Sequence, residues 1–218
     1  MTKIPVYFMP GLAASSTIFE NIKLPEKDFE IYFLEWFIPD PNEHLVEYAR
    51  RMSKFVKHEN AVLIGVSFGG ILVQEMAAFL DLKKLIIISS VKSNEELPQR
   101  MKLAKKTKAY KLLPTSLLHN IEALTKYAFG NMLKERLVLY KKFLTMNDKL
   151  YLDWAIEQVI CWKRSIIDEN VIHIHGDNDN VFPISNIKKC IIVKSGTHIM
   201  IINRYKWFNE NLPKIISE

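Results

Sequence analysis

The sequence predicts a doubly wound α/β domain: a mostly parallel sheet of about six strands, covered by helices and carrying a helical insertion. Two observations lead to this fold class. Short apolar runs alternate with segments of helical period, an order typical of repeated β-α-β units. Three of the runs, at 61–66, 84–90 and 170–174, are apolar at nearly every position, as in strands covered on both faces.

The predicted strands occupy residues 4–9, 30–36, 61–66, 84–90, 170–175 and 189–195. The first follows a lysine and leads into small residues, a pattern that also occurs in signal peptides. Because Pro5 and Pro10 interrupt the apolar stretch, we expect a core strand here and not a cleaved leader.

Helical segments are expected at 42–57, 68–80 and 197–212. In the first, the apolar residues fall on one helical face, and Asn42 is the expected N-cap. These apolar residues are Leu45, Tyr48, Ala49, Met52, Phe55 and Val56.

Residues 93–165 break the alternation of strand and helix. They contain no good strand and several helix-like pieces, separated near Pro114 and Gly130. We therefore expect a core formed by 1–92 and 166–218, with a helical insertion at 93–165.

Charge is concentrated in one part of the 218-residue chain. Residues 92–150 hold 13 Lys and Arg against 5 Asp and Glu, a net +8, whereas the remainder holds 17 against 19. A basic segment can attract nucleic acid, an acidic partner or an anionic substrate such as an acyl-CoA. No basic motif with interleaved aromatic residues is present, so we expect a solvated lysine-rich face and no nucleic-acid partner.

The composition also indicates the cellular compartment of the protein and whether it binds a metal or a cofactor. No apolar run approaches the ~18 residues of a membrane span. The two cysteines, Cys161 and Cys190, lack metal-type spacing and favour reduced thiols in a cytoplasmic protein. We expect neither a metal nor a cofactor.

The segment G-V-S-F-G, residues 65–69, lies where a predicted strand meets a predicted helix. A serine in G-x-S-x-G at such a junction sits on a sharp turn with strained backbone angles, and its flanking glycines avoid collisions. The turn exposes the Ser67 hydroxyl and directs a helix N-terminus toward it, which favours developing negative charge. Gly70 is expected to let the helix pack closely on the sheet.

A serine hydroxyl is a poor nucleophile unless a neighbouring base takes its proton. Of the six histidines, His198 is the best candidate, because it follows the last predicted strand on a short loop. Loops after the carboxyl ends of parallel strands build the sites of such sheets. The sequence favours surface or cap roles for His44, His58 and His119, and a packing role for His173.

An acid is needed to orient the base and to stabilise its charged form. The loop H-G-D-N-D-N-V-F-P, after the fifth predicted strand, offers both Asp177 and Asp179. At least one of the two is expected to serve only the turn.

The chain order Ser67, aspartate, His198 and three motifs resemble the α/β-hydrolase superfamily over nearly the whole chain. H-G-D-N-D-N-V-F-P resembles the family's H-G-x-x-D-x-x-V-P, with Phe182 in place of valine. The resemblance assigns the acid to Asp179 and a structural role to His175. The third motif, M-P-G-L-A-A-S-S-T-I-F, has Pro10 where the family often has histidine.

The resemblance further implies an oxyanion hole made by the backbone amides of Leu12 and Phe68. Family cores often have eight strands, so the first two are expected to be missing here. The insertion at 93–165 falls where the family places its cap, which roofs the site and excludes water.

The sequence therefore predicts a serine hydrolase that acts on an ester or thioester through Ser67, His198 and Asp179. Five aromatic residues are candidates for the substrate pocket, with core packing as the alternative: Trp36, Tyr127, Phe129, Trp154 and Trp162. Two other classes stay open. The same residues can serve an acyltransferase or a lyase, and the scaffold can serve a non-catalytic binding protein.

Overall fold

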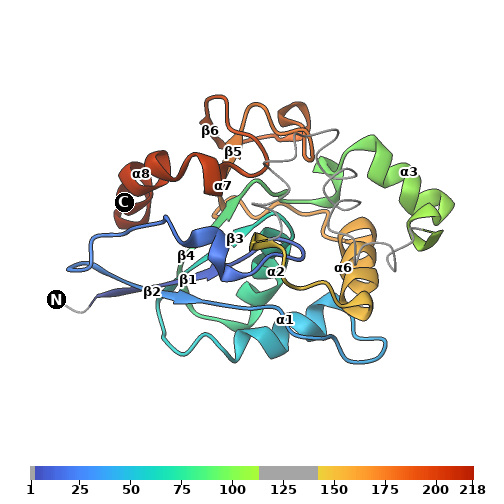
Figure 1. Ribbon diagram of the computed structural model, residues 1–218, viewed down its shortest axis with the longest axis horizontal. Helices are drawn as coiled ribbons and strands as arrows, with labels where there is room; N and C mark the ends of the chain where they lie inside the picture. The colour runs from blue at the N-terminus through green and yellow to red at the C-terminus, as the bar shows by residue number, and fades with distance from the viewer. Residues whose placement is uncertain (1–2, 113–141) are drawn as a thin grey trace.

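Six strands form a single sheet at the centre of the computed structural model, which describes residues 3–112 and 142–218 (Figure 1). The strands are β1 (Ile4–Met9), β2 (Phe29–Phe33), β3 (Ala61–Val66), β4 (Leu82–Ile88), β5 (Ile172–Gly176) and β6 (Ile191–Val193). Their order is β2-β1-β3-β4-β5-β6, and every neighbouring pair is parallel. The predicted parallel α/β sheet is confirmed, with a strand at each of the six predicted places.

Helices cover both faces of this sheet. The α-helices are α1 (Leu45–Ser53), α2 (Phe68–Met76), α3 (Gln99–Thr107), α6 (Lys149–Cys161), α7 (Met200–Asn203) and α8 (Tyr205–Ser217). Short 3₁₀ turns lie at Ser16–Phe19, Ala77–Phe79, Asn94–Glu96, Ala109–Leu112 and Ile184–Asn186. In Figure 1, α1 and α2 lie on one side of the strands and α8 on the other.

Two apolar cores follow from the alternation of side chains along β1. Tyr7 and Met9 face the core that contains α1, α2 and α6. Val6 and Phe8 face the core that contains α7 and α8. Each core side chain removed from water contributes about 1.5–3 kcal/mol, so both faces of the sheet hold the domain together.

The predicted start of the first helix, with Asn42 as its N-cap, is wrong. Asn42 has a left-handed φ of 59°, and α1 begins at Leu45 with His44 as the N-cap. The His44 amide donates to Oε2 of Glu47 at 2.8 Å, which satisfies one of the free N–H groups at this helix end. The helix also ends early, at Ser53, and leaves Phe55 exposed.

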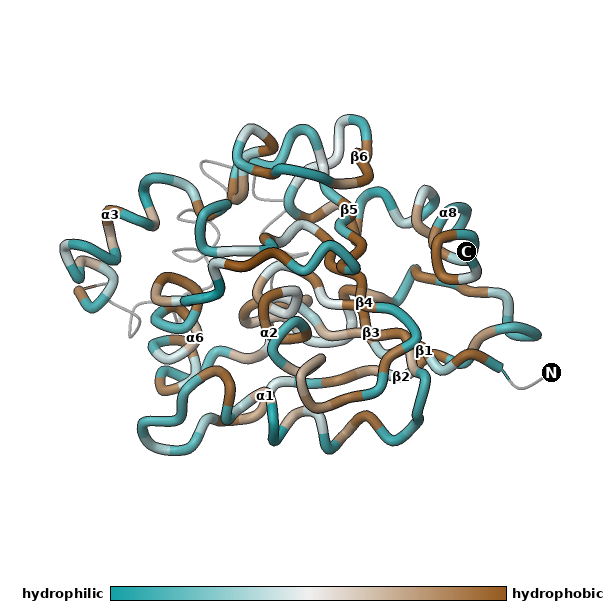
Figure 2. Tube along the Cα trace, turned by 180° about the vertical axis from the view of Figure 1, so that it is seen from behind, coloured by the Kyte–Doolittle hydropathy of each residue, from teal (hydrophilic) through white to brown (hydrophobic). Residues whose placement is uncertain are grey.

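The described part of residues 93–165 is helical, as predicted, and its two α-helices differ in burial. No residue of α3 is buried, and Figure 2 colours this helix mostly as hydrophilic. Helix α6 is buried along much of its length and packs into the core. Just before α6, Leu144 pairs in an isolated antiparallel bridge with Ala14, which follows β1.

The division into a core and an insertion stays a prediction. In the ranges 3–112 and 142–218, no helix is both long and apolar enough to cross a bilayer.

Candidate active site

Ser67 lies on the turn between β3 and α2 in a conformation that non-glycine residues rarely adopt. Its φ is 53° and its ψ is −119°. Two hydrogen bonds hold the turn: the Ser67 amide donates to Ile88 O at 2.9 Å, and Ser90 Oγ donates to Ser67 O at 2.7 Å. Strained backbone of this kind persists where the surroundings fix it, and it is common at functional sites.

The glycines around Ser67 are required by close approaches of the backbone. A Cβ atom on Gly65 would lie 2.3 Å from the carbonyl oxygen of Gly69, inside the turn. A Cβ atom on Gly69 would lie 2.3 Å from Pro10 O, in the segment that follows β1. The expected role of Gly70 needs refinement: its Cβ atom would meet the Ser90 side chain, beyond the end of β4.

His198 and Asp179 complete a chain of hydrogen bonds that begins at Ser67. Nε2 of His198 is 2.9 Å from Ser67 Oγ, and Nδ1 is 2.9 Å from Asp179 Oδ2. Because a carboxylate only accepts, Nδ1 carries the proton and Nε2 of the neutral ring accepts from the Ser67 hydroxyl. A side chain so arranged can withdraw a proton from the serine.

Asp179 is buried, and its two oxygens have different partners. Oδ1 accepts from the amides of Val181 and Phe182 at 2.8 and 2.9 Å, while Oδ2 faces His198. Asp177 is exposed and accepts no hydrogen bond from a described residue. The sequence predicted that one of the two aspartates would serve only the turn, but Asp179 accepts the turn N–H groups and faces His198 as well.

The environment of Asp179 keeps it ionised. Burial acts to raise the pKa of this carboxyl, but the electrostatic interaction with His198, the hydrogen bond to its ring and the Phe182 amide together outweigh burial. The pKa of Asp179 is therefore below its ordinary value. An ionised acid beside Nδ1 stabilises the imidazolium that forms when His198 takes a proton.

Two more histidines continue the polar chain behind Asp179. His175 Nε2 donates to Phe182 O at 2.8 Å and lies 3.6 Å from Asp179 Oδ2. Its Nδ1 then accepts from His173 Nε2 at 3.0 Å. Burial lowers the pKa of both rings, and the effect is larger at His173.

Sequence reasoning missed the contact that brings the acid loop and the histidine loop together. A Cβ atom on Gly176 would lie 2.2 Å from Gly196 O, and the Asn178 amide donates to the same oxygen at 2.9 Å. The two glycines therefore let the loops carrying Asp179 and His198 touch. The only signal in the sequence was a glycine shortly before each side chain: Gly176 three positions before Asp179, and Gly196 two positions before His198.

The two amides expected to bind an oxyanion lie at adjoining segments. Phe68 is the first residue of α2, and Leu12 follows Gly11, whose Cβ position lies 3.4 Å from Ser67 Cβ. Within the described residues, neither amide has a hydrogen-bond acceptor. Both can therefore donate to a ligand.

Two of the candidate pocket residues, Trp36 and Trp154, pack against the same three rings, those of Tyr48, Phe68 and Tyr151. The Trp36 ring is buried against Phe68, Tyr48 and Tyr151. Tyr127 and Phe129 lie outside the described residues.

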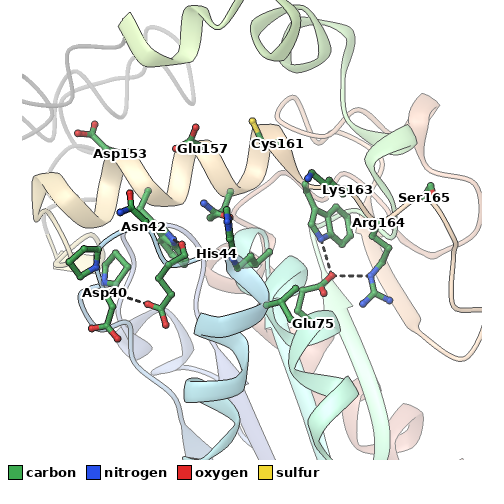
Figure 3. A pocket seen from close by; sticks show the side chains of 18 of the residues that line it. Asp40, Asn42, His44, Glu75, Asp153, Glu157, Cys161, Lys163, Arg164 and Ser165 are labelled. Carbon is green, nitrogen blue, oxygen red and sulfur yellow. Dashed lines mark hydrogen bonds and ion pairs between the residues drawn. The ribbon is translucent and has the colours of Figure 1, made fainter.

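Trp154 and Trp162 line a groove of about 1410 Å³ that is separate from the polar chain at Ser67 (Figure 3). Its walls are residues 39–46, α6 and residues 162–168, with Glu75 at the edge. Glu75 accepts hydrogen bonds from the Trp162 ring and from Arg164 there.

The other histidines and the two cysteines singled out in the sequence lie away from Ser67 or outside the described residues. His44 caps α1, the exposed His58 bonds to Tyr7 Oη, and His119 is not among the described residues. Cys161 and Cys190 are free thiols. The described residues contain no group of three or more His, Cys, Asp and Glu side chains suited to a metal ion.

Several solved structures are similar to this chain in the arrangement of strands and helices. The chain is similar to a hydrolase from Oleispira antarctica, with TM-score 0.77, 10% identity, and coverage of 100% of this chain and 92% of that one. It is similar to an esterase from Exiguobacterium antarcticum, with TM-score 0.68, 16% identity and coverage of 100% and 93%.

A third similar structure is an alpha/beta hydrolase fold protein from Burkholderia ambifaria, with TM-score 0.67, 15% identity and coverage of 98% and 91%. No protein-family model and no curated protein matches the sequence. The similarity covers nearly the whole chain, and the protein has the α/β-hydrolase fold.

Proposed function

We propose that the protein is a serine hydrolase that cleaves esters or thioesters through Ser67, His198 and Asp179. The observation that carries the proposal is the pair of 2.9 Å hydrogen bonds linking these residues at a strained strand-to-helix turn. The ionised Asp179 orients the His198 ring, and the His198 ring accepts the proton of the Ser67 hydroxyl.

The proposed reaction has two halves. Ser67 Oγ attacks the acyl carbon while its proton passes to Nε2 of His198. The bond to the leaving alcohol or thiol then breaks, and Nε2 gives that group the proton. In the second half, water attacks the acyl-serine ester while Nε2 takes a proton from it. The bond between the acyl carbon and Ser67 Oγ then breaks, Oγ receives the proton from Nε2, and the carboxylic acid leaves.

The amides of Leu12 and Phe68 are proposed to bind the oxygen that becomes negative in both halves. Loss of one donor in such a hole typically costs about 10²–10³ in kcat. The helix that begins at Phe68 adds the positive end of its dipole at the same place.

Similar structures support a hydrolase, since they include an esterase and a hydrolase, but a shared fold does not fix the chemistry. An acyltransferase or a lyase on the same residues is the alternative, and a non-catalytic binding protein is a weaker one. Product analysis with water as the sole acceptor separates hydrolysis from transfer. The cap role of 93–165 and a cytoplasmic location belong to the same proposal.

The test of the proposal is covalent labelling of Ser67. A fluorophosphonate probe is expected to label the wild-type protein stoichiometrically, and Ser67→Ala is expected to abolish both the label and ester hydrolysis. The matched control is Ser53→Ala, which removes a hydroxyl that bonds to Arg50 O at the end of α1. Labelling that survives in Ser67→Ala contradicts the assignment.

A screen of activated esters with increasing acyl length then narrows the substrate class.

A further inference from the structure

The segment Gly11–Ala13, which carries the Leu12 amide, is held in an unfavourable backbone conformation. Ala13 is buried and has a φ of 63°, in the left-handed region that residues with a Cβ rarely adopt. Such a conformation lasts only where neighbouring groups fix it. The contacts around this segment therefore decide where the Leu12 amide points.

One contact comes from Trp36, beyond the end of β2. Its Nε1 donates to Gly11 O at 2.8 Å, and its ring stacks on the Phe68 ring with centroids 4.9 Å apart and planes 5° apart. Trp36 thus touches both stretches of backbone that carry the proposed oxyanion donors, Gly11 before Leu12 and Phe68 itself.

A second contact comes from Tyr151, on α6 of the expected insertion. The Ala13 amide donates to Tyr151 Oη at 3.4 Å. The side chain is fully buried, and burial holds the pKa of its phenol well above 10, so the hydroxyl stays neutral. Asp148 fixes this turn of α6 by accepting from the amides of Leu150 and Tyr151.

The backbone on the far side of Ala13 is also paired with residues close to α6. The Met146 amide donates to Ala13 O, and the Ser15 amide donates to Phe143 O, both at 3.0 Å. The Trp36 and Tyr151 rings lie 5.3 Å apart, so the two side chains form one packed unit beside the segment.

We infer that Trp36 and Tyr151 are positioning residues that clamp Gly11 and Ala13, on either side of Leu12, and so aim the Leu12 amide at the reacting oxygen. The inference rests on the proposed function. Through Tyr151, the start of α6 would help to position a catalytic amide, whereas a cap would only cover the site. Neither ring needs to touch the substrate.

The test uses variants that remove one hydrogen bond and keep an aromatic ring at the position, a phenyl ring in place of the larger indole at Trp36 and the same ring at Tyr151. Trp36→Phe loses the bond to Gly11 O, which still accepts from the Ala14 amide at 3.1 Å, so no buried oxygen is orphaned. Tyr151→Phe loses the bond from Ala13. Each is expected to lower kcat for an ester by about ten- to a hundred-fold, because a small misplacement of the donor weakens transition-state binding.

The matched control is Tyr48→Phe. Tyr48 belongs to the same aromatic group and its hydroxyl bonds only to the Phe37 backbone. This variant is expected to lose stability with kcat unchanged.

A readout specific to the oxyanion separates positioning from general damage. A trifluoromethyl ketone forms a serine hemiketal whose oxygen occupies the hole, so its Ki should rise by the same factor as kcat falls in both clamp variants, while KM for the ester stays within about twofold. Hydrogen exchange over residues 10–15 should become faster in both variants, and this readout does not depend on catalysis.

The outcomes distinguish the two proposals. Normal kcat, Ki and exchange in both clamp variants, beside an active and labelled wild type, overturn the clamp alone. Faster exchange with unchanged kcat and Ki also overturns it, because the segment would then be held without serving the reaction. A wild-type protein that neither hydrolyses esters nor takes the probe overturns the proposed function, and the clamp with it.

Discussion

Asp179 and Asp177 lie two positions apart, yet only one of them is buried. The buried carboxylate of Asp179 meets His198 and the two amides of its own turn, whereas Asp177 is exposed. The choice between them rested on resemblance in the sequence, and it now has a physical basis in the geometry of the loop.

Asp179→Asn is expected to lower kcat by about 10⁴, the loss seen in the serine protease that is the reference case for such a triad. Asparagine Oδ1 can still accept from Val181 and Phe182, so the fold should persist. Asp177→Asn, at an exposed site, should change stability by less than about 0.5 kcal/mol and leave kcat unchanged. Steady-state kinetics and thermal melts check both variants. A kinetic loss that follows Asp177 instead would move the acid to that residue.

Strand β5 shows what one element adds to the site. It ends in Gly176, which touches Gly196, and it carries the neutral pair His173 and His175 behind Asp179. Both rings have a pKa lowered by burial, so below a pH of about 6.5 the unfolded chain binds protons that the folded protein does not. Stability therefore falls as the pH falls through that range.

His173→Gln is expected to reduce this pH dependence. In the wild type, each proton taken up only on unfolding costs up to about 1.4 kcal/mol of stability for every pH unit below 6.5. Urea unfolding at pH 7.5, 6.0 and 5.0 measures the slope. The variant should show a shallower slope than the wild type. Equal slopes in the two proteins would show that His173 is not a source of the dependence.

The strands that are apolar at nearly every position were predicted well. The runs at 61–66 and 84–90 read as strands because both faces are covered, and they pair as β3 and β4. The start of α1 was missed because His44 is not among the residues that usually cap helices.

The sequence predicted the candidate site residues that lie within a recognisable motif. It did not predict the contacts between residues that are far apart in the sequence. The clamp role of Trp36 depends on where β2 ends relative to Gly11, and the contact of Gly176 with Gly196 depends on the pairing of β5 with β6. No local pattern in the sequence contains either relation. The sequence therefore predicted which side chains lie together at the candidate site better than it predicted which contacts hold them there.

At the scale of the whole molecule, the charge is unevenly distributed: residues 92–150 carry a net +8 and the rest of the chain −2. Helix α3 contributes Lys105 and Lys106, which are exposed and have no acidic neighbour within the helix. We expect such a distribution to attract anions toward this segment, over a Debye length of about 8 Å at physiological salt.

For an anionic ester, kcat/KM is therefore expected to fall several-fold between 20 and 300 mM salt, roughly the range over which the Debye length shortens most. A neutral ester of the same acyl length should show no such fall. Lys105→Glu with Lys106→Glu should weaken the effect, and Lys27→Glu, before β2, should not. Equal salt dependence for both esters would leave the lysines as a solubilising face.

His198 lies 131 positions after Ser67 in the sequence, and this separation sets an order of events during synthesis of the chain. At 5–20 residues per second, the ribosome takes roughly 7–26 s to add the histidine after the serine. Strands β5 and β6 complete one edge of the sheet, so the nascent protein can build β1 to β4 before either arrives. Throughout that interval the Ser67 hydroxyl is without His198, its hydrogen-bond partner in the folded protein, so the proposed nucleophile is expected to stay unactivated until the last part of the chain is made.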